Sequence, residues 1–329
     1  MFYSIIIPVY NRPDEVKELL DSLDKQSYKQ FEIIIIEDGS SEPCKKIADQ
    51  YTALTIEYFF KENSGPGDSR NFGMAKAKGD YLIFFDSDCI IPTNYFQYVD
   101  DHLTTNPLDC FGGPDAAHDS FSVIQKAINF AMTSVFTTGG IRGKKNNIDN
   151  YQPRSFNMGM KRVVYEHLGG FSDLHPGEDP DLSYRIMNAG YKVGLIEKAF
   201  VYHKRRIDFG KFAKQVYKFG VVRNILIKWY PDKFKSVYLL PSTFLLGSII
   251  LILLSILISK LYIFPLILIA LLLFLEALFK TKNILIALLA VPASFIQLYS
   301  YGFGFLKGFV KILLLKKDER KALPSFFFK

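Results

Sequence analysis

Short apolar runs alternate with helix-type spacing over the first hundred residues of the chain. Runs rich in Ile, Phe and Tyr, as buried strands are, lie at residues 4–9, 31–36, 55–60 and 81–85. Segments with a helical period lie between them, at residues 15–26, 43–51 and 67–78. Strands that alternate with helices indicate βαβ units. We therefore predict an α/β fold with a Rossmann-like, mostly parallel sheet flanked by helices.

The pattern becomes less regular after residue 110. Helix-type spacing recurs at residues 121–135, 163–168 and 181–189. Residues 139–150 are polar and contain glycine, which is typical of a mobile loop. We predict that residues 1–206 form one globular domain, since they are long enough to enclose a hydrophobic core.

Apolar segments dominate residues 236–315, which we predict to be a membrane region. Residues 237–259 carry no charge over 23 residues, which is enough to cross a hydrocarbon core of ~30 Å. Residues 261–279 hold one charge, Glu276, and a third apolar segment at residues 284–306 contains Pro292. Residues 207–235 before them are predicted to be a basic amphipathic linker helix at the membrane surface, with a core helix as the alternative.

Basic residues gather on both sides of the apolar segments, within a net charge of +7. Residues 204–235 hold ten Lys or Arg against two Asp, and residues 307–329 hold seven against two acids. Such clusters are typical of the cytoplasmic flanks of membrane segments. No nucleic-acid-binding motif accompanies them, so we predict membrane lipids and no nucleic acid as partners. Three widely separated cysteines fit a reducing compartment.

These charges predict a multi-pass protein of the cytoplasmic (inner) membrane whose globular domain is cytoplasmic. The basic tail, residues 316–329, is then cytoplasmic as well. Both ends on one side require an even number of spans. We therefore favour a two-helix hairpin, with the third segment broken or partly interfacial; a full third span is the alternative.

Acidic residues follow the predicted strands at the carboxyl ends where ligands bind in such sheets. Glu37-Asp38 follows the second strand, and Asp86-Ser87-Asp88 follows the fourth. Any one of these acids could be a helix cap or a turn residue. Together they form a negative site that favours a cation, and carboxylates suit Mn²⁺ or Mg²⁺ held with substrate phosphates.

A second acidic site, Glu178-Asp179, stands just before the predicted helix at residues 181–189. Asp179 could merely cap that helix. The functional alternative is a general base that takes a proton from an attacking hydroxyl.

With these motifs, residues 3–206 resemble the family-2 glycosyltransferases of the GT-A fold. The matching stretches, in the family's order, are Ile6-Ile7-Pro8-Val9-Tyr10-Asn11, Ile36-Glu37-Asp38-Gly39-Ser40, Gly65 with Arg70-Asn71-Phe72-Gly73, Asp86-Ser87-Asp88, Gly169-Gly170-Phe171 and Glu178-Asp179. Two departures are small: Glu37 replaces the commoner Asp, and Pro180 follows the Glu-Asp pair.

The resemblance implies roles for individual residues. Asp179 matches the catalytic base, and Glu178 beside it orients or touches the acceptor. Asp88 is the metal ligand, joined by Asp86 and by His203, for which a structural role is the alternative. The donor-binding residues implied are Pro8, Tyr10, Asn11, Glu37, Asp38, Arg70, Asn71, Asp86 and Ser87.

The activity implied is metal-dependent, inverting transfer of one sugar from a nucleotide-sugar donor. A UDP-sugar is the donor we expect first, because uridine diphosphate is a common partner in the family. The acceptor is a hydroxyl of a lipid-linked or membrane-proximal glycan, as in cell-envelope glycan or glycolipid synthesis. The chain lacks the Gln-x-x-Arg-Trp signature of processive members, which favours single transfer over polymer synthesis. The alternatives are a polyprenyl-phosphate glycosyltransferase and a non-catalytic membrane subunit that keeps the fold.

Overall fold

The structure is a computed structural model. It describes residues 1–116, 118, 121–138, 151–204 and 208–328, so the loop predicted at residues 139–150 lies outside the described residues. The chain divides into two compact units. The first, here the sheet unit, comprises Met1–His118, Lys145–Lys204 and Phe327–Lys329. The second, here the helical unit, comprises Asp119–Lys144 and Arg205–Phe326. The domain bounds predicted above stay a prediction.

A seven-stranded sheet in the order β3-β2-β1-β4-β8-β6-β9 forms the sheet unit. Its parallel half consists of β1 (Tyr3–Val9), β2 (Phe31–Asp38), β3 (Ile56–Lys61) and β4 (Tyr81–Phe85). The rest consists of β8 (Asn157–Lys161), antiparallel to β4 and β6 (Cys110–Gly112), and β9 (Val193–Leu195), parallel to β6. This confirms the predicted α/β fold with a mostly parallel, GT-A-like sheet.

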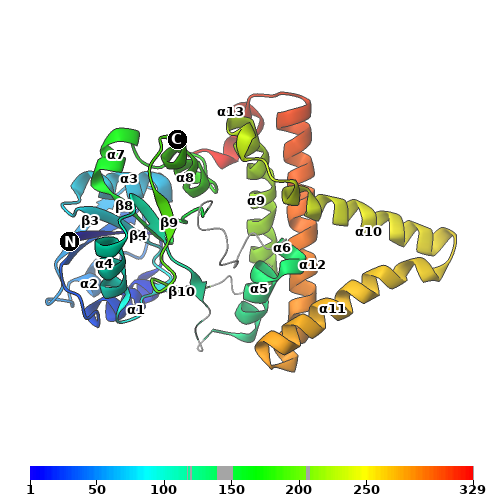
Figure 1. Cartoon of the computed structure of the whole chain (residues 1–329), viewed down its shortest axis with the longest axis horizontal. Coiled ribbons are helices and arrows are strands. Elements are labelled where there is room, and N and C mark those ends of the chain that lie inside the picture. The colour runs from blue at the N-terminus through cyan, green and yellow to red at the C-terminus, as the bar shows by residue number, and fades with distance from the viewer. Residues whose placement is uncertain (117, 119–120, 139–150, 205–207, 329) are drawn as a thin grey trace. The chain divides into compact units, whose positions relative to one another are not determined.

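Helices cover both faces of this sheet (Figure 1). They are α1 (Pro13–Asp24), α2 (Lys45–Ala48), α3 (Pro66–Lys76), α4 (Tyr95–Thr105), α7 (Arg162–Leu168) and α8 (Glu178–Asn188). Side chains alternate along a strand, so Ile5 and Ile7 of β1 enter one core with Leu19 of α1. Ile6 enters the other core with Met74 of α3. Both faces are buried, as parallel sheets require.

A small second sheet brings distant segments to the carboxyl end of β4. It consists of β5 (Cys89–Ile90), β10 (Val201–His203) and β7 (Asp115–Ala116), in the order β5-β10-β7. β10 runs antiparallel to β5, and His203 is the register partner of Cys89. The pairing places His203 beside the residues that follow β4.

The helical unit contains four long helices, α9 to α12, and shorter ones among the described residues. They are α5 (Val123–Thr133), α6 (Val135–Thr138), α9 (Phe209–Trp229), α10 (Leu240–Leu257), α11 (Phe264–Thr281), α12 (Ile284–Gly308) and α13 (Glu319–Ala322). Short helical turns lie at η2 (Pro231–Lys233), η3 (Ser236–Leu239), η4 (Lys260–Ile263), η5 (Phe309–Leu314) and η6 (Pro324–Phe326).

Close packing joins α9 to α12. A Cβ added at Gly220 would lie within 3.0 Å of the Tyr301 carbonyl oxygen, and one at Gly304 equally close to that of Tyr217. Small residues let helix backbones approach in this way. The Asn224 side chain also donates to the Phe305 carbonyl at 3.0 Å. One side of α9 is therefore covered by α12, and the predicted interfacial position of this helix stays a prediction.

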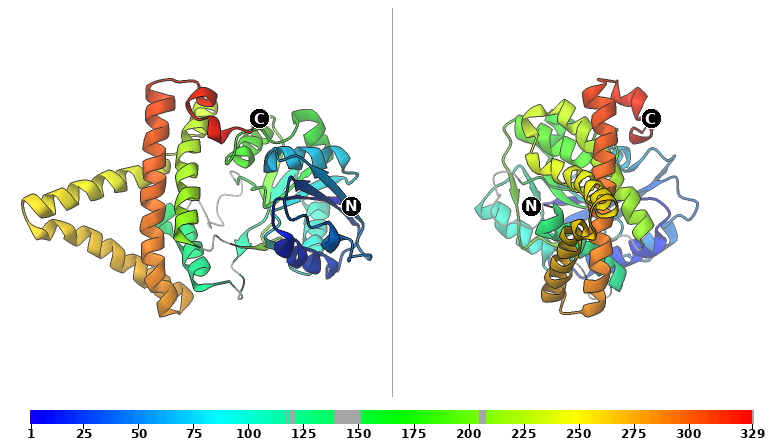
Figure 2. Two further views of the ribbon diagram at one scale, coloured as in Figure 1. Left: turned by 180° about the vertical axis from the view of Figure 1, so that it is seen from behind. Right: turned by 90° about the vertical axis from the view of Figure 1, so that its right-hand side faces the viewer.

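Three helices of the helical unit are long and apolar enough to cross a membrane: Ser236–Leu257, Lys260–Thr281 and Ile284–Leu314. Most of their large apolar side chains face outward, as those of Leu257, Leu261 and Phe279 do. α10 and α11 form a V-shaped hairpin that points away from α12 (Figure 2). The third segment is one continuous helix through Pro292. It is therefore not broken, and the other two possibilities, a partly interfacial segment and a full third span, stay predictions. These helices support membrane association.

Candidate active site

Asp86-Ser87-Asp88 lies where β4 leaves the sheet and before β5 begins. The five residues of β4 are all buried and fix the start of this turn in the core. Ser87 is buried, whereas the side chains of Asp86 and Asp88 are 33% and 13% exposed. Two carboxylates therefore reach the surface from a rigid strand end, where repulsion between them favours a cation.

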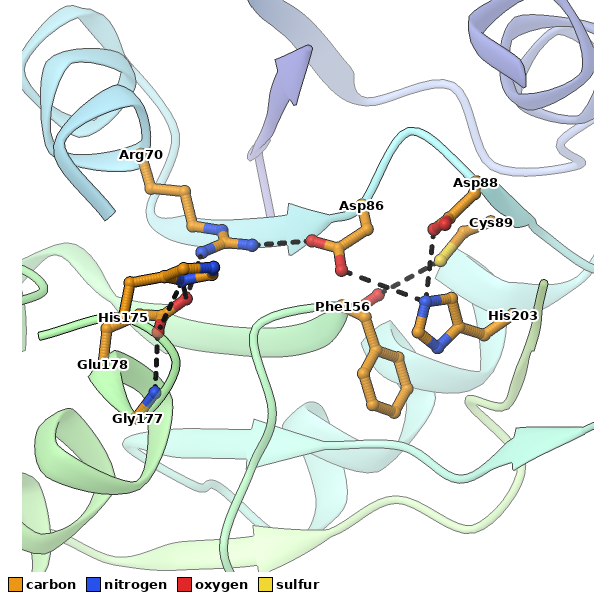
Figure 3. A network of polar contacts seen from close by, with 9 residues as sticks. All are labelled: Arg70, Asp86, Asp88, Cys89, Phe156, His175, Gly177, Glu178 and His203. Carbon is orange, nitrogen blue, oxygen red and sulfur yellow. Dashed lines mark hydrogen bonds and ion pairs between the residues drawn. The ribbon is translucent and has the colours of Figure 1, made fainter. Parts of the chain in front are cut away.

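His203 faces these carboxylates from β10 (Figure 3). Its Nε2 lies 3.2 Å from Asp88 Oδ1 and 3.9 Å from Asp86 Oδ2. The other Asp88 oxygen lies 3.5 Å from Arg12 Nη1. The structure thus brings together the three residues predicted to bind the metal, although His203 comes more than 110 residues after Asp86 and Asp88 in the chain.

The donor atoms around Asp88 suit a divalent ion. Ligand atoms of Asp88, Cys89 and His203 all lie within 4.8 Å of one another. The Cys89 thiol points instead to the Phe156 carbonyl, with its Sγ 3.6 Å from that oxygen (Figure 3). Mn²⁺ and Mg²⁺ prefer oxygen ligands, so we assign Asp86, Asp88 and His203, in place of Cys89, as the set that fits.

Arg70 links the two acidic sites. It projects from α3, and its side chain is only 3% exposed. Its Nη2 donates to Asp86 Oδ1 at 2.6 Å, and its Nη1 to Glu178 Oε1 at 3.3 Å (Figure 3). A planar guanidinium can hold two carboxylates in fixed positions, which a lysine cannot. Arg70 therefore positions these acids.

Glu178 is the first residue of α8 and is held in its ionised form. Its carboxylate accepts from the Gly177 amide at 2.9 Å and contacts His175 Nδ1 at 3.2 Å. Burial alone would raise the pKa of Glu178, but the charge and hydrogen bond of His175, with Arg70, outweigh it and lower the pKa. Glu178 is therefore an anion that fixes the start of α8.

Asp179 differs from its neighbour in its pKa. It is half-buried, and no side-chain hydrogen bond to it is found among the described residues. Burial, followed by the charge of Glu178, raises its pKa to about 6, against the opposing charges of Arg154 and Arg70. A carboxyl group with a raised pKa accepts a proton more readily near neutral pH.

Glu37 and Asp38 use their carboxylates within the fold. Glu37 is fully buried and accepts from Ser40 Oγ, the Cys44 amide at 2.8 Å and Tyr58 at 3.1 Å. Asp38 accepts from the Gly65 amide at 2.9 Å, the Ser64 amide at 3.0 Å and Lys61 at 2.7 Å. Glu37 shapes the loop between β2 and α2, and Asp38 shapes the loop between β3 and α3. Their donor contacts stay a prediction, and we now expect Glu37 to act only through the loop.

The two asparagines of the donor set also bind backbone groups. Asn71 exchanges two hydrogen bonds with the Phe171 backbone, at 2.8 and 2.7 Å. Asn11 has a φ of 52° and accepts from the Ser41 and Glu42 amides. They support the turns around the site. Tyr10, the residue after β1, is 53% exposed and free to stack on a ligand, and Pro8 lies near the end of β1.

The sequence analysis missed His175 and Phe328. Phe328 donates its amide to the Asp173 carbonyl at 2.9 Å, and Phe327 forms a bridge with Leu174. The Phe328 ring lies 5.5 Å from the His175 ring and fills the space where Gly65 would carry a Cβ. His175 had a signal in the sequence, since it stands three residues before Glu178; Phe328 had none.

Comparison with known proteins identifies the family. The model for glycosyl transferase family 2 matches residues 4–169, half of the chain. The protein belongs to glycosyl transferase family 2. This confirms the predicted family and its GT-A fold.

Individual relatives match over different lengths. Glycosyltransferase AglE of Haloferax volcanii is 25% identical over 67% of this chain and 72% of its own length. Glycosyltransferase GlyA of Streptococcus pneumoniae is 25% identical over 65% of this chain, which spans only 27% of GlyA. Among solved structures, the mannosyltransferase PcManGT of Pyrobaculum calidifontis, in complex with GDP-Man and Mn²⁺, has a TM-score of 0.63 at 16% identity. The match covers 89% of this chain and 86% of that one.

Proposed function

We propose that the protein transfers a single sugar, with inversion, from a nucleotide-sugar to a hydroxyl of a lipid-linked or membrane-proximal acceptor. The observation that carries this proposal is the pair of acidic sites joined by the buried Arg70. One site, at Asp86 and Asp88, suits the donor diphosphate with its cation. The other, at Asp179, suits the acceptor hydroxyl. A sugar undergoing direct displacement lies between such groups.

Asp86, Asp88 and His203 would hold the divalent ion, Mn²⁺ or Mg²⁺. When bound, the ion supplies positive charge that stabilises the departing diphosphate. The protein's own part is to fix the ligands: β4 sets the two carboxylates, and the β5–β10 pairing sets the imidazole. Arg70 holds Asp86 at 2.6 Å, so its carboxylate is oriented before the donor arrives.

Asp179 is the proposed general base. It takes the proton of the acceptor hydroxyl as that oxygen attacks the anomeric carbon, while the bond from this carbon to the diphosphate oxygen breaks. A single base and direct attack from the opposite side give inversion. The ionised Glu178 beside it contributes by raising the pKa of Asp179.

A membrane-proximal acceptor is supported by the helical unit. Among the described residues, three helices suit a bilayer. Of these, α10 and α11 project as a hairpin (Figures 1 and 2) and carry many exposed large apolar residues. The hairpin tip carries Lys260, whereas Lys233, Lys235, Lys280 and Lys282 lie at its base. By the positive-inside rule, the base is cytoplasmic. We propose two spans, with α12 and α9 along the cytoplasmic surface.

The test is metal-dependent nucleotide binding. The full chain in detergent is melted with UDP, GDP, CDP or dTDP, each with Mn²⁺ or with EDTA. A nucleotide at 100 times its dissociation constant should stabilise the protein by ~2.7 kcal/mol. We expect one nucleotide to do so with Mn²⁺ only, and Asp88→Asn to abolish the effect while Asp232→Asn, an exposed control, keeps it. Absence of any shift in a cooperatively melting protein would overturn the proposal and favour a non-catalytic subunit.

The Asp179→Asn variant distinguishes the proposed hydroxyl acceptor from the polyprenyl-phosphate alternative. A phosphate acceptor is already ionised and needs no strong base. Turnover that survives in Asp179→Asn but is lost in Asp88→Asn would favour the phosphate acceptor. Loss in both variants supports a hydroxyl acceptor.

A further inference from the structure

A basic cavity lies within the helical unit, apart from the residues assigned to sugar transfer. Its volume is about 380 Å³, within the range of roughly 300–1,000 Å³ that is typical of ligand sites. Four lysines line it, two from α9, one from the end of α12 and one from η5; Tyr217 and residues 322–326 complete the wall. We call it the lysine cavity. Its lysines are Lys214, Lys218, Lys307 and Lys311.

The periodicity of the two helices directs these lysines to one place. Lys214 and Lys218 are four residues apart on α9, as Lys307 and Lys311 are on α12 and η5, so each pair shares one helix face. α9 and α12 are locked together at Gly304, which brings the two pairs to the same cavity. The cluster is therefore fixed by packed helices and not by flexible loops.

The positive charge of the lysine cavity is not neutralised by the protein. Among its lining residues, all of which the structure describes, none is acidic. Lys311 donates to the Ala322 carbonyl at 3.1 Å, and Lys307 lies over the Tyr217 ring at 5.6 Å. The nearby Glu319 is already taken by Lys228 at 2.5 Å and Trp229 at 2.8 Å. Four cations around one cavity repel one another unless an anion lies between them.

The surroundings of the lysine cavity are those of a membrane surface. Phe303, Phe309 and Val310, next to Lys307 and Lys311 in the chain, are exposed large apolar residues. They belong to the segment Ile284–Leu314, which is apolar and long enough for a membrane. Lysines bordering an exposed apolar surface match a lipid, whose phosphate meets the charges and whose chains cover the apolar side chains.

We propose that the lysine cavity binds the phosphate group of a membrane lipid. Lysine binds phosphate as a point charge with three donors, so the site selects an anionic headgroup without demanding one fixed orientation. This site would hold α9 and α12 at the headgroup level. The proposal concerns binding alone and does not depend on sugar transfer.

The experiment measures lipid binding to the full chain in detergent by native mass spectrometry, with no nucleotide present. Phosphatidylglycerol, phosphatidylcholine and inorganic phosphate are the three probes. We compare wild type with Lys214→Gln/Lys218→Gln, whose lysines have no carboxylate partner among the described residues. Lys233→Gln/Lys235→Gln is the matched control, since both lysines lie beside the first apolar segment but outside the cavity.

A membrane-surface lysine contributes about fivefold to binding of an anionic lipid. We therefore expect the cavity variant to bind the first phosphatidylglycerol about 25-fold more weakly, and the control within about twofold. Phosphatidylcholine should bind wild type more weakly, and inorganic phosphate should not displace the lipid. Equal losses in the cavity variant and the control would overturn the proposal. Binding of inorganic phosphate without any preference for phosphatidylglycerol would also overturn the proposal, because the cavity would then be a site for a free anion.

Folding of the cavity variant is checked by its melting curve. If Lys214→Gln/Lys218→Gln does not melt cooperatively, Lys218→Gln alone replaces it, with an expected loss of about fivefold. An unchanged first dissociation constant in that folded variant counts against the proposal.

Discussion

The rate of the enzyme should fall at acidic pH as Asp179 becomes protonated. As the base, it works only when ionised, and its pKa is raised to about 6. At pH 5 about one Asp179 in eleven is ionised, so kcat/KM should be about tenfold below its plateau. Initial rates of nucleotide release, measured from acid to neutral pH with a membrane extract as the acceptor source, give this profile.

Glu178→Gln tests the physical cause of that fall in rate. The charge of Glu178 is the second cause of the raised pKa of Asp179, after burial. Removal of this charge should shift the fall in kcat/KM to lower pH. Glu166→Gln, an exposed control on α7, should leave the pH of that fall unchanged. Because Glu178→Gln also frees Arg70, its plateau should fall. A fall at unchanged pH in folded Glu178→Gln, or full turnover by Asp179→Asn, would refute the assignment of Asp179 as the base.

The same pKa predicts an effect of Asp179 on stability. The folded state holds this proton more tightly than the unfolded chain, whose ordinary value is 3.8. The stability gained from protonation is therefore full below that value and is lost as the pH rises through about 6. At neutral pH the ionised group costs at most ~3 kcal/mol, at 1.36 kcal/mol per pKa unit. Asp179→Asn should therefore raise Tm at neutral pH and lose that advantage in acid.

Three further substitutions test how the fold supports its sites. Arg70→Lys should lower kcat/KM about 100-fold, because a lysine cannot hold Asp86 and Glu178 together; a loss under twofold would show that the bridge is dispensable. Phe328→Ala should lower the unfolding free energy by about 1–2 kcal/mol in chemical denaturation, since it removes a half-buried ring that packs near His175. A loss no larger than that of the exposed control Phe60→Ala would contradict this packing. Gly304→Val should cost about 3 kcal/mol or more by separating α9 from α12. Gly247→Val, where a Cβ meets nothing within 4 Å, should have little effect, and equal Tm values would argue against the pairing.

Sequence reasoning located the parallel half of the sheet because its signals are local. Strand β4 begins and ends where the apolar run at residues 81–85 predicted, and β1 to β3 differ from their predicted bounds by one or two residues. β8 was missed because Asn157–Lys161 combines glycine, asparagine and lysine. Its buried Asn157 is compensated by partners from distant segments, Tyr95 at 2.6 Å and the Ala199 carbonyl at 2.8 Å. Such compensation depends on the tertiary fold and leaves no periodicity to read.

The candidate site, like the fold, could be predicted from the sequence only in part. The motifs gave the acids their places at strand ends, but not their partners. The sequence does not show that the side chains of Glu37 and Asn71 already form hydrogen bonds within the fold. The contact of Arg70 with both acidic sites joins residues 16 and 108 positions away. It is visible only once α3, β4 and α8 are packed together.

The burial of Arg70 predicts that the two acidic sites are coupled. An isolated guanidinium in the core costs several kcal/mol, so it persists only while carboxylates face it from both sides. Arg70 is 3% exposed, with Asp86 on one side and Glu178 on the other. A cation bound near Asp86 would compete with Arg70 for that carboxylate and so weaken one arm of the bridge. The other arm holds Glu178, next to the proposed base. We therefore expect donor binding to change the charge around Asp179 through this one buried side chain.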